Sequence, residues 1–153
     1  MELKDIKAVY FIGAGGIGMS AIARYFIHRG LVVAGYDKTP STLTAQLEKE
    51  GMLIHYEENV NDIPHACKKQ ESTLVVYTPA IPQEHKELVF FRENNFDVEK
   101  RAQVLGMLTR THKGLCVAGT HGKTTTSTMC AHIMHQSSID CNAFLGGISK
   151  NYG

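Results

Sequence analysis

Two glycine-rich loops carry the residues of this 153-residue chain that are best suited to bind phosphate. The first, "GAGGIG", places Gly13, Gly15 and Gly18 in the pattern G-x-G-x-x-G, between an apolar run and a helical one. Glycine at these positions permits a tight turn, lets the backbone approach a diphosphate and lets the helix pack on the sheet. The first-turn amides and the positive end of the helix dipole then face the anion. The loop predicts a diphosphate site.

An acidic residue accompanies this loop. Asp37 ends the next apolar run, about 20 residues further on, where dinucleotide-binding folds place the acid that holds a ribose hydroxyl. A uridine diphosphate sugar presents the same diphosphate and ribose as a dinucleotide. The motif alone therefore leaves two ligands open, and a nicotinamide-binding oxidoreductase or regulatory module remains an alternative. A tight turn without any ligand is the further alternative, and it is disfavoured because the strand, the helix and the acid all lie where a phosphate site needs them.

The second loop, "GTHGKTT", has the residue types of a triphosphate cradle. Gly119 and Gly122 free the backbone to turn its amides inward, Lys123 can reach the β and γ phosphates, and the Thr124 hydroxyl can bind Mg²⁺. The common pattern G-x-x-x-x-G-K-[ST] would need glycine where this chain has Val117, so the loop is a shorter G-x-x-G-K-T. It predicts an ATP site with Mg²⁺.

The second loop lacks the rest of an active site. Phosphoryl transfer uses a further acidic Mg²⁺ ligand and a residue that orients the nucleophile. After Thr128 the only carboxylate is Asp140. We therefore expect this part of the chain to bind phosphate without turnover, as the front edge of a longer domain, and a standalone kinase or NTPase is disfavoured.

The elements that must position these loops are indicated by alternating β-rich and helical runs. Strands are predicted at 7–13, 31–37, 52–56, 72–79 and 96–100, and helices at 18–29, 41–50, 84–95 and 101–111, with Ser41 as an N-cap. Such alternation predicts α/β architecture, a doubly wound Rossmann-like parallel sheet over residues 1–111. Residues 112–153 then predict the opening of a second α/β unit: a strand at 115–119, the phosphate loop, a helix to about 136 and the start of a strand at 142–147.

Composition bounds the class of protein. Hydrophobic residues make up 43% and charged residues 20%, with a formal net charge of +1, which is ordinary for a globular chain. This balance predicts neither a nucleic-acid nor a membrane partner. The N-terminus "MELKDIK" has no signal-peptide core, and glycines interrupt the longest apolar runs. We expect a cytoplasmic location.

Taken together, "GAGGIGMSAIA", "GYD", "TPAI", "KRAQVL" and "AGTHGKTTT" resemble the ATP-dependent muramyl ligases of bacterial peptidoglycan synthesis. The resemblance spans the whole chain and implies an N-terminal domain followed by the start of a central ATPase domain. It implies that ATP phosphorylates the lactyl carboxylate of UDP-N-acetylmuramate, and that the amine of L-alanine attacks the acyl phosphate to give an amide. The first loop would then hold UDP rather than NAD.

The resemblance also implies site residues. The UDP-substrate site would comprise Gly13, Ala14, Gly15, Gly16, Ile17, Gly18, Met19 and Ser20 around the diphosphate, Asp37 near the uridine, and Thr78, Pro79, Ala80, Ile81 and Arg101 along the crevice. The ATP site would comprise Gly119, Thr120, His121, Gly122, Lys123, Thr124 and Thr125, with Lys123 as the catalytic residue that stabilises the transferring phosphoryl group and Thr124 on Mg²⁺.

Three positions depart from the family's usual pattern. Tyr36 stands where a small serine is usual, Pro79 replaces a hydroxyl residue, and Gln103 stands where glutamate is common. Pro79 has no backbone N–H, so the crevice has one donor fewer at that point.

Overall fold

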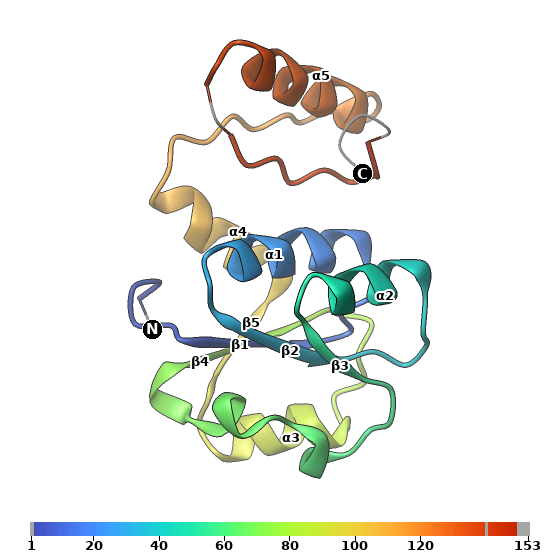
Figure 1. The fold of residues 1–153 in the computed structure, drawn as a ribbon, viewed down its shortest axis with the longest axis vertical. Coiled ribbons are helices and arrows are strands. Elements are labelled where there is room, and N and C mark those ends of the chain that lie inside the picture. Colours follow the sequence, from blue (N-terminus) through green and yellow to red (C-terminus); the bar gives the residue numbers. More distant parts are fainter. Residues whose placement is uncertain (1, 140, 150–153) are drawn as a thin grey trace.

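A computed structural model of the chain describes residues 2–139 and 141–149. Its centre is a five-stranded parallel sheet in the order β3-β2-β1-β4-β5 (Figure 1). The strands are β1 (Ala8–Ile12), β2 (Val32–Tyr36), β3 (Leu53–His55), β4 (Thr73–Tyr77) and β5 (Asp97–Lys100). The predicted doubly wound Rossmann-like sheet is confirmed. Its order reverses beside β1, which pairs with β2 on one side and β4 on the other.

Helices cover both faces of the sheet. On one face lie α1 (Ile17–His28), α2 (Thr42–Lys49) and α4 (Arg101–Arg110), and on the other lies α3 (Lys86–Glu93) (Figure 1). Three short 3₁₀ helices, Val60–Asp62, His65–Lys68 and Gln70–Ser72, lie between β3 and β4. Each pair of consecutive parallel strands is thus joined by a helical connection, as a parallel sheet requires.

Each face of the sheet has its own apolar core. Successive side chains of β1 alternate between them, so that Val9 and Phe11 join α1, α2 and α4, while Tyr10 and Ile12 join α3. All five residues of β1 are buried. A strand buried on both faces has a continuous apolar sequence. Such a run is easy to recognise, so the predicted bounds of this strand agree closely with β1.

The predicted N-cap of α2 is confirmed. The Ser41 hydroxyl accepts a hydrogen bond from the Thr44 amide at 3.1 Å, and the Thr44 hydroxyl accepts one from the Ser41 amide at 2.9 Å. This reciprocal pair satisfies two amides that the helix itself leaves without partners. The helix therefore begins where the sequence placed it.

The strand predicted at 115–119 is wrong. Within the described residues this segment forms no strand, and the Leu115 side chain is 74% exposed. A parallel strand is stable only when neighbouring strands take up its amides and carbonyls, and the described residues offer none here. The helix that comes next does form, as α5 (Lys123–Gln136).

The strand start predicted at 142–147 is also wrong. Described residues 141–149 form no strand, and Phe144 instead packs on the apolar core beneath α1. Phe144, one of the apolar residues that suggested a strand, instead holds this segment against the part of the chain that carries the sheet, residues 2–111. No helix among the described residues is long and apolar enough to cross a bilayer.

Candidate functional site

The first glycine loop forms the turn between β1 and α1. The amides of Gly13 and Ala14 both donate to the carbonyl of Tyr36, at 2.8 and 3.0 Å, which bends the chain across the end of β2. Gly13 has a φ of +89°, a conformation that glycine adopts without strain. The turn lies at the carboxyl ends of the strands, beside the point where the strand order reverses, which is where open α/β sheets bind ligands.

Asp37 closes one side of this turn. Its Oδ2 accepts a hydrogen bond from the Gly15 amide at 2.6 Å, and its Oδ1 accepts one from the Thr39 amide at 3.1 Å. A Cβ on Gly15 would lie 2.9 Å from the same Oδ2, so glycine is needed for this close approach. Each carboxylate oxygen can accept a further hydrogen bond. The contact between Asp37 and a ribose stays a prediction.

Residues from the loop after β4 and from α4 close the other side. A Cβ on Gly13 would lie 2.7 Å from Thr78 Cγ2 and 3.4 Å from Ile81 Cδ1, and a Cβ on Gly18 would lie 2.7 Å from Arg101 Nη1. The structure therefore brings Thr78, Ile81 and Arg101 to the glycine turn. Pro79 and Ala80 are exposed on the loop after β4 and line neither of the two cavities that border α1.

One of these cavities, of about 330 Å³, lies over the start of α1. Among the described residues, Arg101 contributes the only charged side chain to its lining, and no carboxylate lines it. Its lining consists of Gly16, Ile17, Gly18, Met19, Ala21, Ile22, Thr78, Arg101, Leu105, Phe144, Leu145 and Gly146. A helix N-terminus and a guanidinium therefore face the same space, and both favour an anion.

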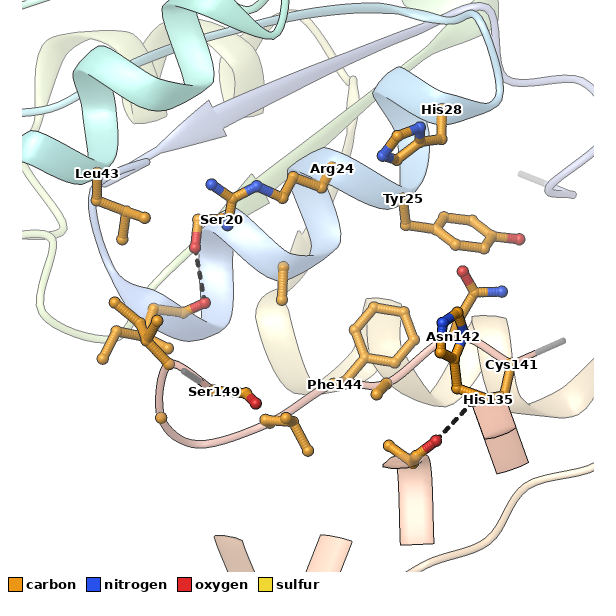
Figure 2. A pocket seen from close by; sticks show the side chains of 17 residues that line it. Ser20, Arg24, Tyr25, His28, Leu43, His135, Cys141, Asn142, Phe144 and Ser149 are labelled. Carbon is orange, nitrogen blue, oxygen red and sulfur yellow. Dashed lines mark hydrogen bonds between the residues drawn. The ribbon is translucent and has the colours of Figure 1, made fainter. Parts of the chain in front are cut away.

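A second cavity of about 320 Å³ lies along the outer face of α1 (Figure 2). Arg24 lines this cavity, and its guanidinium donates three hydrogen bonds of 2.8–3.0 Å to the Glu50 carboxylate. Ser20 lines this cavity rather than the first, and its hydroxyl donates to the Ile17 carbonyl at 2.8 Å. Ser20 is thus the one predicted diphosphate residue from α1 that faces away from the Arg101 cavity.

The second glycine loop precedes α5 and is open to solvent. Gly122 is the N-cap of α5, with a φ of +76°, and residues 119–126 are all exposed. The Lys123 ammonium donates to the carbonyls of Gly119 at 2.6 Å and Thr120 at 3.1 Å. The lysine is therefore folded back across its own loop, and residues 119–125 line neither of the cavities that border α1.

The residues around the second loop fit Mg²⁺ only in part. The Thr124 hydroxyl, in the first turn of α5, is an oxygen of the kind that Mg²⁺ prefers. Residues 119–139 and 141–149 contain no Asp or Glu. The described part of this loop thus offers hydroxyl and carbonyl oxygens but no carboxylate.

A buried polar network lies on the opposite face of the sheet, and no motif in the sequence indicated it. The Glu87 side chain of α3 is fully buried, and its Oε2 accepts from the Tyr10 hydroxyl at 2.7 Å. The same hydroxyl lies 2.6 Å from His55 Nε2, and the Asn59 amide donates to Glu87 Oε1 at 3.2 Å. Burial raises the pKa of Glu87, although these hydrogen bonds oppose the shift. The network joins β1, β3 and α3 on the face of the sheet opposite to α1.

Six lining residues of the Arg101 cavity were missed by the sequence interpretation. They are Ala21, Ile22, Leu105, Phe144, Leu145 and Gly146. Leu105 follows helical spacing on α4 and resembles any core residue. The pair Gly146-Gly147 was the available signal, because adjacent glycines often mark a close approach of the backbone to a neighbour.

Comparison with known proteins agrees with this geometry. A family model described as "Mur ligase family, catalytic domain" matches residues 8–113. The chain is 65% identical to a UDP-N-acetylmuramate–L-alanine ligase of Phocaeicola vulgatus over 153 residues, and 62% identical to that of Parabacteroides distasonis over 152. These matches cover 100% and 99% of this chain, but each covers only 33% of the relative.

A solved structure supports the same relationship. The UDP-N-acetylmuramate–alanine ligase of Thermotoga maritima superimposes with a TM-score of 0.82 at 33% identity, over 94% of this chain and 33% of that one. The chain spans about a third of the length of the curated relatives it matches. The glycine turn, the parallel sheet and these matches lead to one conclusion: the chain belongs to the Mur ligase family.

Proposed function

We propose that the chain is the UDP-sugar-binding part of a ligase that joins L-alanine to UDP-N-acetylmuramate in peptidoglycan synthesis. The observation that carries the proposal is the cavity over the start of α1, where Arg101 supplies the only charge among the described lining residues. The names of the relatives supply the substrate. They also favour a ligase over the nicotinamide-binding alternative.

In this proposal the diphosphate lies between the start of α1 and Arg101. The amides of the first turn of α1 and the Arg101 guanidinium donate to the phosphate oxygens, while Gly16 and Gly18 leave room for them. Asp37 and its neighbours lie toward the uridine, and Thr78 borders the diphosphate, whereas Pro79 and Ala80 lie outside this cavity. Phe144 and Leu145 give the same cavity an apolar wall.

The reaction needs the sugar nucleotide and ATP in contact. A carboxylate oxygen of the lactyl group attacks the γ-phosphorus of ATP, the bond to the β–γ bridging oxygen breaks, and ADP leaves. The amine of L-alanine then attacks the acyl carbon, loses a proton and expels phosphate as the amide forms. When ATP binds, Lys123 exchanges the carbonyls of its own loop for phosphate oxygens and stabilises the charge that develops on them.

Mg²⁺ would sit at the Thr124 hydroxyl, where it would neutralise phosphate charge. Phosphate and water oxygens would supply the other ligands, because residues 119–139 and 141–149 contain no carboxylate side chain. We accordingly propose that residues 1–111 form the UDP-sugar-binding domain and that residues 112–153 open the ATP-binding domain. Because both substrates are cytoplasmic metabolites in this proposal, the chain works in the cytoplasm, with no nucleic acid or membrane as partner.

Ligand titration of the purified chain tests the proposal. UDP-N-acetylmuramate should give a binding isotherm in calorimetry, and about a 100-fold excess over its Kd should stabilise the fold by about 2.7 kcal/mol. NAD⁺ should do neither. MgATP should bind weakly, because the second loop is exposed and lacks carboxylate neighbours in the described residues. Submicromolar affinity for MgATP would contradict that account of the second loop.

A matched pair of arginine substitutions locates the site. Arg101→Met should weaken UDP-N-acetylmuramate binding by about tenfold or more, because charge-assisted hydrogen bonds are lost. Arg24→Met makes the same change beside the other cavity and should leave affinity within about twofold, since Arg24 is already paired with Glu50. Stabilisation by NAD⁺ alone, or equal effects of the two substitutions, would refute the assignment.

A further inference from the structure

Residues 144–147 are attached to the first unit of the chain on one side. Phe144 packs against the apolar core beneath α1, and its ring centroid lies 6.1 Å from that of Tyr25. Figure 2 shows the Phe144 side chain directed toward α1. Phe144, Leu145 and Gly146 also line the cavity over the first glycine turn. This stretch is therefore a wall of the proposed sugar-nucleotide site.

The same stretch touches the second glycine loop on its other side. A Cβ on Gly146 would lie 3.3 Å from Thr124 Oγ1, and a Cβ on Gly147 would lie 3.3 Å from Thr124 Cγ2. Both distances are shorter than nearly all contacts that Cβ atoms make in proteins, so Thr124 would have to move by a few tenths of an ångström. Two successive residues thus pass Thr124 so closely that a side chain on either would have to push it.

Space, rather than backbone conformation, explains these two glycines. The described glycines with positive φ are Gly13, Gly30, Gly51, Gly119 and Gly122, so Gly146 and Gly147 adopt backbone angles that other residues also adopt. A residue with a Cβ at either position would instead lie too close to the Thr124 side chain. Glycine allows both a positive φ and a close approach of the backbone to a neighbour, and the close approach is what applies at Gly146 and Gly147.

We propose that Gly146 and Gly147 are positioning residues that set the distance between the two phosphate loops. The wall is anchored to the sugar-nucleotide cavity through Phe144 and rests on Thr124 through the bare backbone of the two glycines. This inference rests on the proposed function. The carboxylate in one site must reach the γ-phosphate in the other, so the spacing between them controls the rate of phosphoryl transfer rather than the binding of either substrate.

Alanine substitutions in a complete ligase test the spacing. Turnover is measured on the Phocaeicola vulgatus ligase in which this chain replaces the matching third. Gly146→Ala should lower kcat by about tenfold, because a shift of a few tenths of an ångström is smaller than the ~1 Å misplacement that can cost ~100-fold. KM for UDP-N-acetylmuramate and for ATP should change by less than about threefold. Gly106→Ala is the control, since a Cβ there meets nothing within 4 Å.

A second substitution at Thr124 identifies the contact. Thr124→Ser keeps the hydroxyl and removes Cγ2, the atom that a Cβ on Gly147 would press. In the Thr124→Ser background, Gly147→Ala should therefore lose its effect on kcat, whereas Gly146→Ala, which presses on Oγ1, should keep it. Thermal unfolding of each variant shows whether it folds, and if Gly146→Ala does not, the Gly147→Ala pair decides.

The outcomes separate the two proposals. If the unsubstituted 153-residue chain does not bind UDP-N-acetylmuramate in calorimetry, the proposed function fails. If it binds and Gly146→Ala turns over like its parent, the spacing role is wrong and the proposed function stands. A rise in KM for the sugar nucleotide alone, or equal losses for Gly147→Ala in both backgrounds, also overturns the spacing role.

Discussion

At the scale of single residues, the first glycine turn is defined by the side chains that crowd around it. Gly13, Gly15 and Gly18 each have a side chain from another element within 3 Å of where a Cβ would stand. The sequence indicated that these glycines form a phosphate-binding turn, because each position in their spacing has a defined structural role. It identified Thr78 and Arg101 only through family resemblance, and it missed Phe144, because contacts made from distant parts of the chain leave no local pattern.

Gly18→Ala should separate ligand binding from folding. The new methyl would meet the end of the flexible Arg101 side chain, at 2.7 Å from Nη1, so Arg101 must move while the backbone need not. UDP-N-acetylmuramate affinity should fall by about tenfold, with little change in the unfolding midpoint. Calorimetry and thermal unfolding measure the two quantities, and Gly106→Ala is the control. Unchanged affinity would show that Arg101 does not contact the ligand.

His85 gives the fold a dependence on pH. It is buried beneath Tyr36, with ring centroids 4.7 Å apart, and neither ring nitrogen has a hydrogen-bond partner among the described residues. Burial lowers the pKa of His85, His55 lowers it further, and Glu58 acts in the opposite direction. As the pH falls below about 6.5, the unfolded chain takes up this proton first, so stability is lost.

His85→Leu should flatten this dependence. The free energy of unfolding in urea should fall less steeply between about pH 7 and about pH 5 than in the parent. Glu87, whose pKa is raised by burial, favours the fold at low pH and loses that contribution as pH rises, but it is present in both proteins. His65→Leu, at an exposed position, is the matched control. Parallel pH profiles for parent and His85→Leu would contradict the prediction.

At the scale of elements, the sequence predicted all five strands of the described sheet. It also predicted two further strands that do not form in the described residues. The five strands of the sheet exchange hydrogen bonds with one another, so local pattern and tertiary pairing agree. Residues 115–119 and 142–147 have the same apolar pattern but no partner strand among the described residues. An apolar pattern shows only that a segment is able to form a strand. The strand forms when a neighbouring strand is present to pair with it.

Two identical substitutions should change stability in opposite directions. Gly35→Ala would place a Cβ 2.4 Å from the Phe11 carbonyl oxygen, which belongs to the backbone of β1 and cannot turn aside. We expect a loss of about 1–3 kcal/mol in the free energy of unfolding. Gly106→Ala, inside α4 with open space around it, should gain up to about 1 kcal/mol from helix propensity.

Chemical denaturation of both variants measures these changes. If Gly35→Ala were as stable as the parent, the close pairing of Phe11 with Gly35 in adjacent strands would not constrain the sheet.

At the scale of the whole molecule, residues 112–139 and 141–149 contact the sheet domain over a small area, in which Phe144 takes part. The connecting segment before α5 is exposed, and α5 itself exposes Met129 and Ile133 by 60% and 63%. Phe144 supplies a ring contact to α1. The sequence predicted a boundary near residue 111 from the change of motif, but the resting position of the segment after that boundary depends on contacts that no local pattern encodes.

Phe144→Ala should loosen the second unit and spare the first. Amides of α5 should exchange with deuterium at least about tenfold faster, because the loss of a half-buried aromatic ring favours opening of the attached segment. Amides of β1 and β4 should exchange as before. Leu115→Ala is the control, since the Leu115 side chain is 74% exposed. Faster exchange throughout the sheet would mean that the two units unfold together.

The double hydrogen bond at the end of β2 has a consequence for how this family can vary. The carbonyl of residue 36 accepts both turn amides, and a carbonyl is the same in tyrosine as in serine. The turn is thus indifferent to the side chain at 36, which leaves that side chain to adapt to His55 and His85 on the opposite face. A lineage can replace serine with tyrosine there without rebuilding the loop, whereas proline at 13 or 14 would remove a donor that nothing else can supply.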